Sequence, residues 1–380
     1  MNYYLSSHQQ QRAWININHQ ALVNNVRELK RFLNPETKLM AVIKADGYGH
    51  GAVKVAQTIL KSGVDSLAIA TLSEGIELRE AGINAPILIL GAINTKNEIK
   101  DIVEYKLEPT LCTPPQAFIF AETLSHLNAT LPVHLKLDTG MSRLGTHWHN
   151  AVDFVNYIQQ FPQLHLVSIY SHLATADDIN TSVMMLQHSR FEEAISALKT
   201  SVINLPLLHL ANSAGTLSDR HLHYDMVRVG LALYGIYPAS HLKEKLKLQP
   251  ALEVKARITQ IKTLPPDTGV SYSHTFKSDR QTKIAVVGIG YADGIPRLLS
   301  NKIKVIIKGR FANQIGNITM DQLMLNVTDF PDLEVGEIVT LLGKDGNLDI
   351  SADDWANTMG TISWEILCGF KNRLPRINNI

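Results

Sequence analysis

The sequence predicts an α/β protein with an N-terminal (β/α)8 barrel of the TIM type and a C-terminal, mainly antiparallel β domain. Short apolar runs alternate with stretches of helical spacing early in the chain, and eight strands alternating with helices in roughly 230 residues fit a closed barrel. After Pro238 the pattern changes to Val/Ile/Thr-rich alternation broken by Gly, Pro and Asp, as in antiparallel sheets. We therefore predict a barrel domain over 1–238 and a β domain over 239–380.

The predicted strands of the barrel are apolar runs bounded by turn residues. They lie at 39–43, 67–71, 87–90, 108–111, 133–137, 166–170, 207–210 and 225–229. Helical spacing is clearest at 180–200, behind a cap at Asn180 and Thr181, and it recurs at 50–61, 72–81, 114–127 and 149–159. An open, doubly wound sheet is the alternative for the same alternation of strands and helices.

The β domain is predicted from alternating segments such as LEVKARITQIKTL, which begins at Leu252, and KIAVVGIGYADG, which begins at Lys283. The polar segment 239–249 is the expected junction between the two domains. A short helix is expected at 353–359.

Composition excludes several classes of protein. With 45% hydrophobic and 19% charged residues the chain is not disordered, and 36 Lys+Arg against 35 Asp+Glu, without a basic block, argue against a nucleic-acid partner. No apolar run is long enough for a membrane span, and the polar segment Met1–Arg12 does not read as a secretory signal. Isolated Cys112 and Cys368 favour a reduced, cytoplasmic protein. The HWH and HLH triplets lack a third ligand, so no metal site is expected.

The motif AVIKADGYGHG, residues 41–51, carries the first candidate for chemistry. An apolar strand delivers Lys44 to the catalytic end of a barrel, and a glycine-rich, flexible turn follows it. A partly desolvated lysine has a lowered pKa and is a competent amine for a Schiff base. The alternative is a lysine that leaves the barrel and reaches solvent.

A second group follows the last two predicted strands, in HLANSAG (209–215) and MVRVGLALYG (226–235). Barrel enzymes often bind a phosphate there, and Ser213 with the amides of Gly230 and Leu231 fits that role. Alternation directs Arg228 into the barrel mouth, where a buried cation must be paired. Its partner is either an anionic or aromatic-nitrogen ligand or a structural carboxylate such as Asp225.

Two weaker signals lie at the same end of the barrel. KLDTGMSRLG (136–145) ends a strand in a polar turn with Asp138 and Arg143, although loop arginines are usually solvated. SHLATADD (171–178) places His172 there, where a lone histidine is more often a satisfied hydrogen-bonding group than a base.

Seven motifs resemble, in type and order, those of alanine racemases, which are fold-type III pyridoxal-phosphate enzymes. They are the four motifs that contain Lys44, Arg143, Ser213 and Arg228, followed by VSYSHTF (270–276), GYADG (290–294) and ITMDQ (318–322). The resemblance covers the chain from Arg12 to Ile377 and implies an isomerase that interconverts L- and D-alanine with pyridoxal 5'-phosphate, supplying D-alanine for peptidoglycan of the cell wall.

The resemblance also implies roles for individual residues. Lys44 would hold the cofactor as a Schiff base and act as one base, and Tyr272 would be the second base, on the opposite face. A tyrosine has a pKa of about 10, so it needs the help of His172, which hydrogen-bonds the tyrosine and the matching arginine in relatives. Arg228 would face the pyridine nitrogen, leave it unprotonated and so disfavour transamination.

The remaining site residues are likewise implied by the resemblance. Tyr48 would reach the phosphate; Arg143 would contact the ring O3′ and the substrate, held by Lys136, which is carbamylated in some relatives. Met320 would offer its backbone N–H to the substrate carboxylate and Tyr291 would help to gate the entrance. Asn212 and Asp321 are supporting residues, and the role of Asp321 stays open.

One residue departs from the family pattern. TISWEILCG (361–369) has Trp364 where the family usually has a tyrosine that bonds the cofactor phosphate, and an indole offers only an N–H donor on a larger ring. We expect weaker retention of the cofactor or altered side-chain tolerance, against the alternative of harmless drift.

The resemblance implies a homodimer, because Tyr272, Tyr291 and Met320 come from the β domain of the partner chain in this family. Three other functions stay open. A racemase of broader specificity would also accept serine, since an apolar pocket discriminates one hydroxyl by only about 1 to 3 kcal/mol. A basic amino-acid decarboxylase of the same fold and a non-catalytic pyridoxal-phosphate carrier are disfavoured by Tyr272 and Arg228 and by the β domain.

Overall fold

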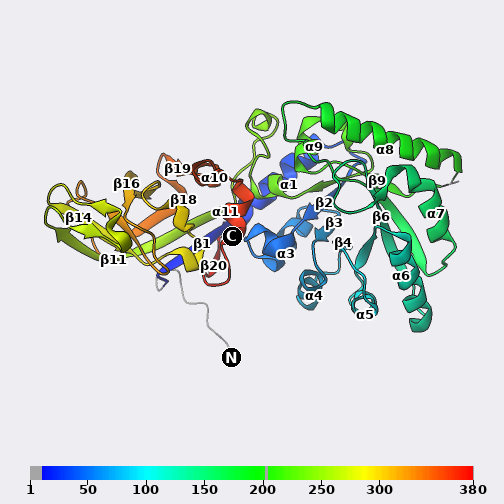
Figure 1. The fold of residues 1–380 in the computed structure, drawn as a ribbon, viewed down its shortest axis with the longest axis horizontal. Helices are drawn as coiled ribbons and strands as arrows, with labels where there is room; N and C mark the ends of the chain where they lie inside the picture. Colours follow the sequence, from blue (N-terminus) through cyan, green and yellow to red (C-terminus); the bar gives the residue numbers. More distant parts are fainter. Residues whose placement is uncertain (1–10, 202–203, 380) are drawn as a thin grey trace. The chain divides into compact units, whose positions relative to one another are not determined.

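The computed structural model describes residues 11–201 and 204–379, which divide into two compact units (Figure 1). The barrel unit contains residues 21–47 and 52–249, and the β unit contains residues 11–20, 48–51 and 250–379. Relative to the domains expected from the sequence, the barrel unit continues to residue 249, and the β unit takes in two short segments from the N-terminal part of the chain.

The barrel unit is built on parallel strands that pair in the order β10-β2-β3-β4-β5-β6-β8-β9. The strands are β2 (Lys38–Val42), β3 (Ser66–Ile69), β4 (Ile87–Ala92), β5 (Glu108–Leu111), β6 (Leu131–Asp138), β8 (Leu164–Tyr170), β9 (Leu207–His209) and β10 (Met226–Val229), with β7 (Thr146–His147) beside β6. Two backbone hydrogen bonds join the ends of this order, from Asp225 N to Leu208 O at 3.1 Å and from Arg228 N to Ala211 O at 3.0 Å. The sheet therefore closes, and the predicted barrel is confirmed over the open doubly wound sheet.

Most helices of the barrel unit follow the strands, and α3 to α8 lie outside them in Figure 1. They are α1 (His19–Phe32), α2 (Lys44–Tyr48), α3 (Ala52–Lys61), α4 (Leu72–Glu80), α5 (Lys96–Glu104), α6 (Pro114–Leu127), α7 (Ala151–Gln159), α8 (Ser182–Ser201) and α9 (Ser213–Ser218). Of these, α1, α2, α5 and α9 were not predicted. Local sequence sets several helix starts: at α5, Thr95 accepts from the N–H of Glu98 and the Glu98 carboxylate accepts from the Thr95 N–H, which is a capping box.

The β unit is a mainly antiparallel sheet, as predicted, in the order β19-β18-β15-β16-β17-β14-β11-β1-β20. Its strands are β1 (Ala13–Asn18), β11 (Leu252–Leu264), β14 (Thr282–Val287), β15 (Lys304–Ile307), β16 (Arg310–Ile315), β17 (Leu323–Asn326), β18 (Ile338–Asp345), β19 (Leu348–Ile350) and β20 (Arg376–Asn379), and β12 (Gly269–Val270) pairs with β13 (Phe276–Lys277). Two helices, α10 (Ala352–Met359) and α11 (Ser363–Gly369), complete the unit.

The N-terminal strand β1 was not predicted. Its residue Ile15 pairs antiparallel with Val254 of β11 and parallel with Arg376 of β20. Because Ala13, Trp14, Ile15 and Ile17 are buried, this short strand contributes to the core of the β unit and ties the start of the chain to its end.

Within the described residues, no helix combines the length and the hydropathy that a membrane span requires. The prediction that Met1–Arg12 is not a secretory signal falls mostly on residues 1–10, which lie outside the described residues.

Candidate active site

Lys44 follows the buried strand β2 directly, and an unusual turn fixes the backbone behind it. Ala45, Asp46 and Gly47 all adopt left-handed conformations, with φ of 53°, 53° and 62°, although only glycine does so without cost. The Ala45 N–H donates to Glu74 Oε1 at 2.7 Å. The glycine-rich turn that the sequence suggested to be flexible is therefore a defined left-handed turn, and such strain is concentrated at functional sites.

Arg228 is 3% exposed and lies inside the barrel, as alternation predicted. Its Nη1 donates to the backbone oxygen of His209 at 3.1 Å, and its Nη2 donates to the backbone oxygens of Ser171 at 2.6 Å and Leu210 at 3.2 Å. Two imidazoles also accept from it: Nδ1 of His209 at 2.9 Å and Nδ1 of His172 at 3.3 Å. Both terminal nitrogens are thus committed to neutral acceptors.

The structural carboxylate considered as a partner for Arg228 serves another purpose. Asp225 accepts from the backbone N–H of Leu208 at 2.7 Å. Among the described residues, no carboxylate lies within ion-pair distance of Arg228, and none accepts from its Nε–H. The alternative of a salt bridge with Asp225 is wrong, and one N–H of a buried guanidinium is left for a ligand.

The aromatic ring of Tyr170 packs against the Arg228 guanidinium. Its ring lies 4.9 Å from the Arg228 guanidinium and stacks on the His209 ring at 4.8 Å, while its hydroxyl pairs with the Thr110 hydroxyl at 2.7 Å. Burial lowers the pKa of Arg228 to about 10 and raises the pKa of Tyr170 above its usual value. Arg228 therefore stays a cation and Tyr170 a neutral phenol at neutral pH.

Lys136 lies on β6 with its Nζ 5.6 Å from the centre of the Tyr170 ring. It is 5% exposed, and burial together with the charge of Arg228 lowers its pKa to about 8. A substantial fraction of this amine is neutral near physiological pH, and it is the neutral form that reacts as a nucleophile.

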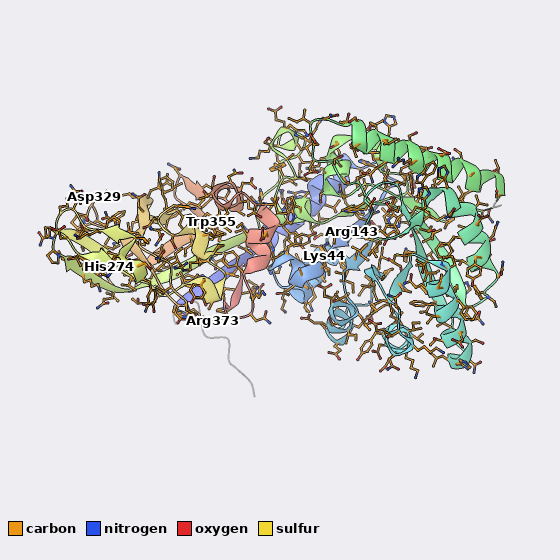
Figure 2. All side chains as sticks on the ribbon, in the orientation of Figure 1. Lys44, Arg143, His274, Asp329, Trp355 and Arg373 are labelled. Atoms are coloured by element: carbon orange, nitrogen blue, oxygen red, sulfur yellow. The ribbon has the colours of Figure 1, made fainter. Side chains whose placement is uncertain are left out.

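His172 stands where positive charges converge. Its pKa lies well below the usual value, first because of burial and then because of Arg228, Lys136, Arg143 and Lys44. Figure 2 shows the labelled Lys44 and Arg143 in the same region of the barrel unit. The predicted residues Lys44, Lys136, Arg143, His172 and Arg228 are thus brought together in a site with an excess of cations.

Ser213 follows β9 and contacts Gly230, which follows β10 and precedes Leu231. The Ser213 hydroxyl accepts from the Gly230 N–H at 3.0 Å, and Ser213 is the first residue of α9. Asn212 caps this helix by accepting the Gly215 N–H at 2.9 Å. A hydroxyl and adjacent backbone amides at a loop after a barrel strand are a suitable cradle for a phosphate.

The β unit presents Tyr272, Tyr291 and Met320 with exposed fractions of 71%, 43% and 53%. Tyr272 follows Ser271, which has a φ of 65° and whose hydroxyl donates to the Asn317 backbone oxygen at 2.7 Å. The N–H of Tyr291 donates to Thr319 O at 3.0 Å, which joins the segments of Tyr291 and Met320. Large side chains of this kind, left exposed on one unit, are typical of an interaction surface.

A charged network supports the same region of the β unit. The fully buried carboxylate of Asp293 accepts from both terminal nitrogens of Arg12, at 2.9 and 2.6 Å, and from the Gly290 N–H at 3.0 Å. Arg373, labelled in Figure 2, pairs with Asp321 and approaches Asp293 at 3.5 Å. Asp321, whose role the sequence left open, thus belongs to an ion-pair network beside Met320.

Tyr48 and Trp364 both belong to the β unit. Tyr48 has a pKa raised by burial and by the nearby Cys368 thiol of α11. A Cβ at Gly49 would come within 2.5 Å of Leu367 O, so only glycine lets the Tyr48 segment lie this close to the helix. Trp364 is half-buried on α11, where it was predicted to depart from the family pattern.

Several residues of the site were missed from the sequence. Tyr170 and Glu74 contact the cation and the lysine turn through pairings distant in sequence, which no local pattern reports. Gln187 of α8 was missed for the same reason: its side chain donates to His172 O at 3.0 Å and accepts from the Ala174 N–H at 2.8 Å. A polar residue on the buried face of an otherwise amphipathic helix was the available signal.

Comparisons with known proteins match both the barrel and the β part of the chain. The profile of the alanine racemase N-terminal domain matches residues 17–238, and that of the alanine racemase C-terminal domain matches residues 251–378. Alanine racemase from Synechocystis sp. is 60% identical over 97% of this chain and 99% of its own. Alanine racemase from Bacillus anthracis with bound L-Ala-P superposes at a TM-score of 0.92 and 33% identity, covering 100% of this chain and 96% of that chain. Alanine racemase from Bartonella henselae with covalently bound pyridoxal phosphate superposes at a TM-score of 0.87 and 28% identity, covering 97% of this chain and 100% of that chain.

Proposed function

The chain belongs to the alanine racemase family, and we propose on that premise that it interconverts L- and D-alanine with pyridoxal 5'-phosphate as its cofactor. The observation that carries the proposal is the convergence of Lys44, Lys136, Arg143 and Arg228 on the buried His172, whose pKa their charges lower. Such a site suits a cofactor with an anionic phosphate and a phenolic oxygen, because its charges complement those of the site.

The residues present fit this cofactor at both ends. Ser213 with the amides of Gly230 and Leu231 would hold the phosphate, and Tyr48 would add a hydroxyl. Arg143 would contact the ring oxygen, with Lys136 beside it. Asn212 supports the phosphate end by capping α9.

The ring nitrogen would face Arg228. The Nη atoms of Arg228 are committed to backbone oxygens and imidazoles, while its Nε–H has no acceptor among the described residues. A guanidinium donates and cannot accept a proton, so the nitrogen opposite it would stay unprotonated. When bound, the cofactor makes the Cα proton of an amino acid acidic, and an unprotonated ring limits how far the resulting charge spreads.

Racemisation requires a proton to leave one face of Cα and another to arrive on the opposite face. Lys44 would hold the cofactor and exchange a proton at its Nζ on one face, and Tyr272 of a partner copy would exchange a proton at its hydroxyl on the other. His172 is neutral because its pKa is low, and its Nδ1 accepts from Arg228, so its proton lies on Nε2. That N–H would donate to the tyrosine oxygen and stabilise the phenolate.

Exposure of Tyr272, Tyr291 and Met320 supports a homodimer in which each β unit completes the partner's site. Met320 would bind the substrate carboxylate through its backbone N–H and Tyr291 would narrow the entrance. We further propose a cytoplasmic enzyme that supplies D-alanine for peptidoglycan, with no membrane or nucleic-acid partner.

Three measurements on the purified protein test the proposal. Absorbance and borohydride reduction followed by peptide mapping should locate the cofactor on Lys44. Chiral analysis of product from L-alanine should give D-alanine, with loss of activity in Lys44→Ala. Cofactor on another lysine, or no D-alanine from a fully loaded enzyme, would reject it; turnover of serine alone would favour the alternative specificity.

A further inference from the structure

A chain of buried polar side chains crosses the interior of the barrel behind Arg228. Each of five neighbouring strands contributes one member: Glu108 from β5, His134 from β6, Ser168 from β8, His209 from β9 and Arg228 from β10. His134, Ser168, His209 and Arg228 are at most 3% exposed, and the Glu108 side chain is 18% exposed. Polar groups buried in this way are held by their hydrogen bonds, so the sequence of contacts can be followed atom by atom.

The contacts are continuous from end to end. Arg228 Nη1 lies 2.9 Å from His209 Nδ1, and His209 Nε2 lies 2.7 Å from the Ser168 hydroxyl. The same hydroxyl lies 2.5 Å from His134 Nδ1, and His134 Nε2 lies 2.8 Å from Glu108 Oε2. Four hydrogen bonds thus connect a cation to a carboxylate that is four strands away in the barrel.

The two ends determine which way every proton points. A guanidinium can only donate, so His209 accepts at Nδ1 and carries its proton on Nε2, which donates to Ser168. Among the described residues, the Ser168 hydroxyl has no acceptor other than His134 Nδ1, so it donates there. His134 then carries its proton on Nε2 and donates to the Glu108 carboxylate, which can only accept. Burial and the charge of Arg228 also lower the pKa of His209 well below its usual value, in keeping with a neutral ring.

We propose that Glu108, His134 and Ser168 form, with His209, a one-way hydrogen-bond relay that sets how strongly Arg228 donates to the cofactor ring. The inference rests on the proposed function, since it assigns a tuning role to residues that touch neither cofactor nor substrate. Hydrogen bonds in a chain polarise one another in a medium of low dielectric constant, so the negative charge of Glu108 acts on Arg228 through the three residues between them. Arg79 is also close enough to Glu108 for their charges to interact.

The direction of the effect follows from the charge. With Glu108 anionic, electron density is pushed toward Arg228 and its remaining N–H is a weaker donor. Without that charge, the Nε–H of Arg228 would donate more strongly, the ring would accept more charge, and amino-group transfer would compete better with racemisation. With the cofactor bound, that side reaction would remove the Cα proton of alanine and add a proton to the cofactor carbon that carries the amino nitrogen, and water would supply the carbonyl oxygen of the pyruvate released.

Glu108→Gln is the first test, because the amide oxygen can still accept from His134 while the charge is removed. Ser168→Ala interrupts the relay in its middle, and Glu122→Gln on α6 is a matched control, an exposed glutamate that pairs with Lys96 outside the relay. We expect the ratio of pyruvate to D-alanine to rise by about threefold to tenfold in Glu108→Gln, a factor of ten corresponding to one pKa unit. Ser168→Ala should give a similar rise and the double variant no further rise, because the residues act as one unit.

Nitrogen-15 spectra of the cofactor-free protein test the relay independently of activity. His134 and His209 should both show a protonated Nε2 and an unprotonated Nδ1 at neutral pH, in the wild type and in Glu108→Gln. A protonated Nδ1 on either ring would overturn the relay. Unchanged product ratios in both single variants, or rises that add in the double variant, would also overturn it. If the wild type forms no D-alanine, the proposed function fails instead, and the spectra still decide the proton positions.

Discussion

Replacing Asp293 by asparagine should destabilise the β unit and weaken substrate binding together. Asp293 has a fully buried carboxylate that accepts two hydrogen bonds from Arg12 and one from the Gly290 N–H. An asparagine keeps one acceptor oxygen and turns a donor toward Arg12, so at least one charged hydrogen bond is lost. A hydrogen bond to a charged group contributes roughly 1.5 to 3 kcal/mol. The Arg12 side chain is 39% exposed, so water replaces part of the lost hydrogen bonding. We therefore expect the free energy of unfolding to fall by about 2 kcal/mol.

Urea unfolding provides the assay. With a slope of about 2 to 3 kcal/mol per molar, Asp293→Asn should lower the midpoint of the β unit by roughly 0.7 to 1 M. The ion-pair network of Asp293 positions the segments that carry Tyr291 and Met320. Because these residues are proposed to contact the substrate, KM for alanine should rise by a larger factor than kcat falls. Asp329→Asn is the control, because Asp329 is an exposed carboxylate of the same unit (Figure 2). A midpoint within error of the wild type, or equal shifts in both variants, would refute the assigned role of the ion pair.

Three further predictions concern the site. Lys44→Ala and Tyr272→Phe, each inactive, should regain about a quarter of wild-type activity when unfolded and refolded together, since half of randomly formed dimers are mixed and each holds one intact site; no recovery would exclude a shared site. Lys136 has a folded pKa of about 8 against an ordinary 10.5, so the unfolded chain binds more protons between these values and the unfolding free energy should rise with pH there. Lys136→Met should lack this rise, and parallel curves would contradict it. Trp364→Tyr should slow dissociation of the cofactor or change the alanine-to-serine preference; if neither moves, Trp364 is a neutral replacement.

Periodicity alone was sufficient for most of the fold. The barrel strands were predictable because strands such as β2 and β3 are buried on both faces and appear as uninterrupted apolar runs. β1 was not, because its role depends on pairing with β11 and β20 more than two hundred residues away in the chain. A six-residue segment before a helix carries no local sign of such partners.

The residues of the candidate site likewise fall into those that local sequence identifies and those that depend on contacts between distant segments. Lys44, Ser213 and Arg228 stand at strand ends or inside apolar runs, where their polarity is itself a signal. Glu108, His134 and Ser168 were within predicted strands, yet their meaning depends on the register that aligns His134 with Ser168 across β6 and β8. Tyr170 likewise looked like an ordinary end of a strand until its stacking on His209 was known.

The central claim is that this chain moves a proton between the two faces of alanine Cα through Lys44 and Tyr272. The most direct measurement is incubation of the loaded enzyme with L-alanine in D₂O, following Cα deuterium and D-alanine together. The account predicts that D-alanine appears with deuterium at Cα, that Lys44→Ala abolishes both, and that Tyr272→Phe abolishes the inversion. Exchange without inversion in the wild type, or D-alanine formed by Tyr272→Phe at the wild-type rate, would contradict it.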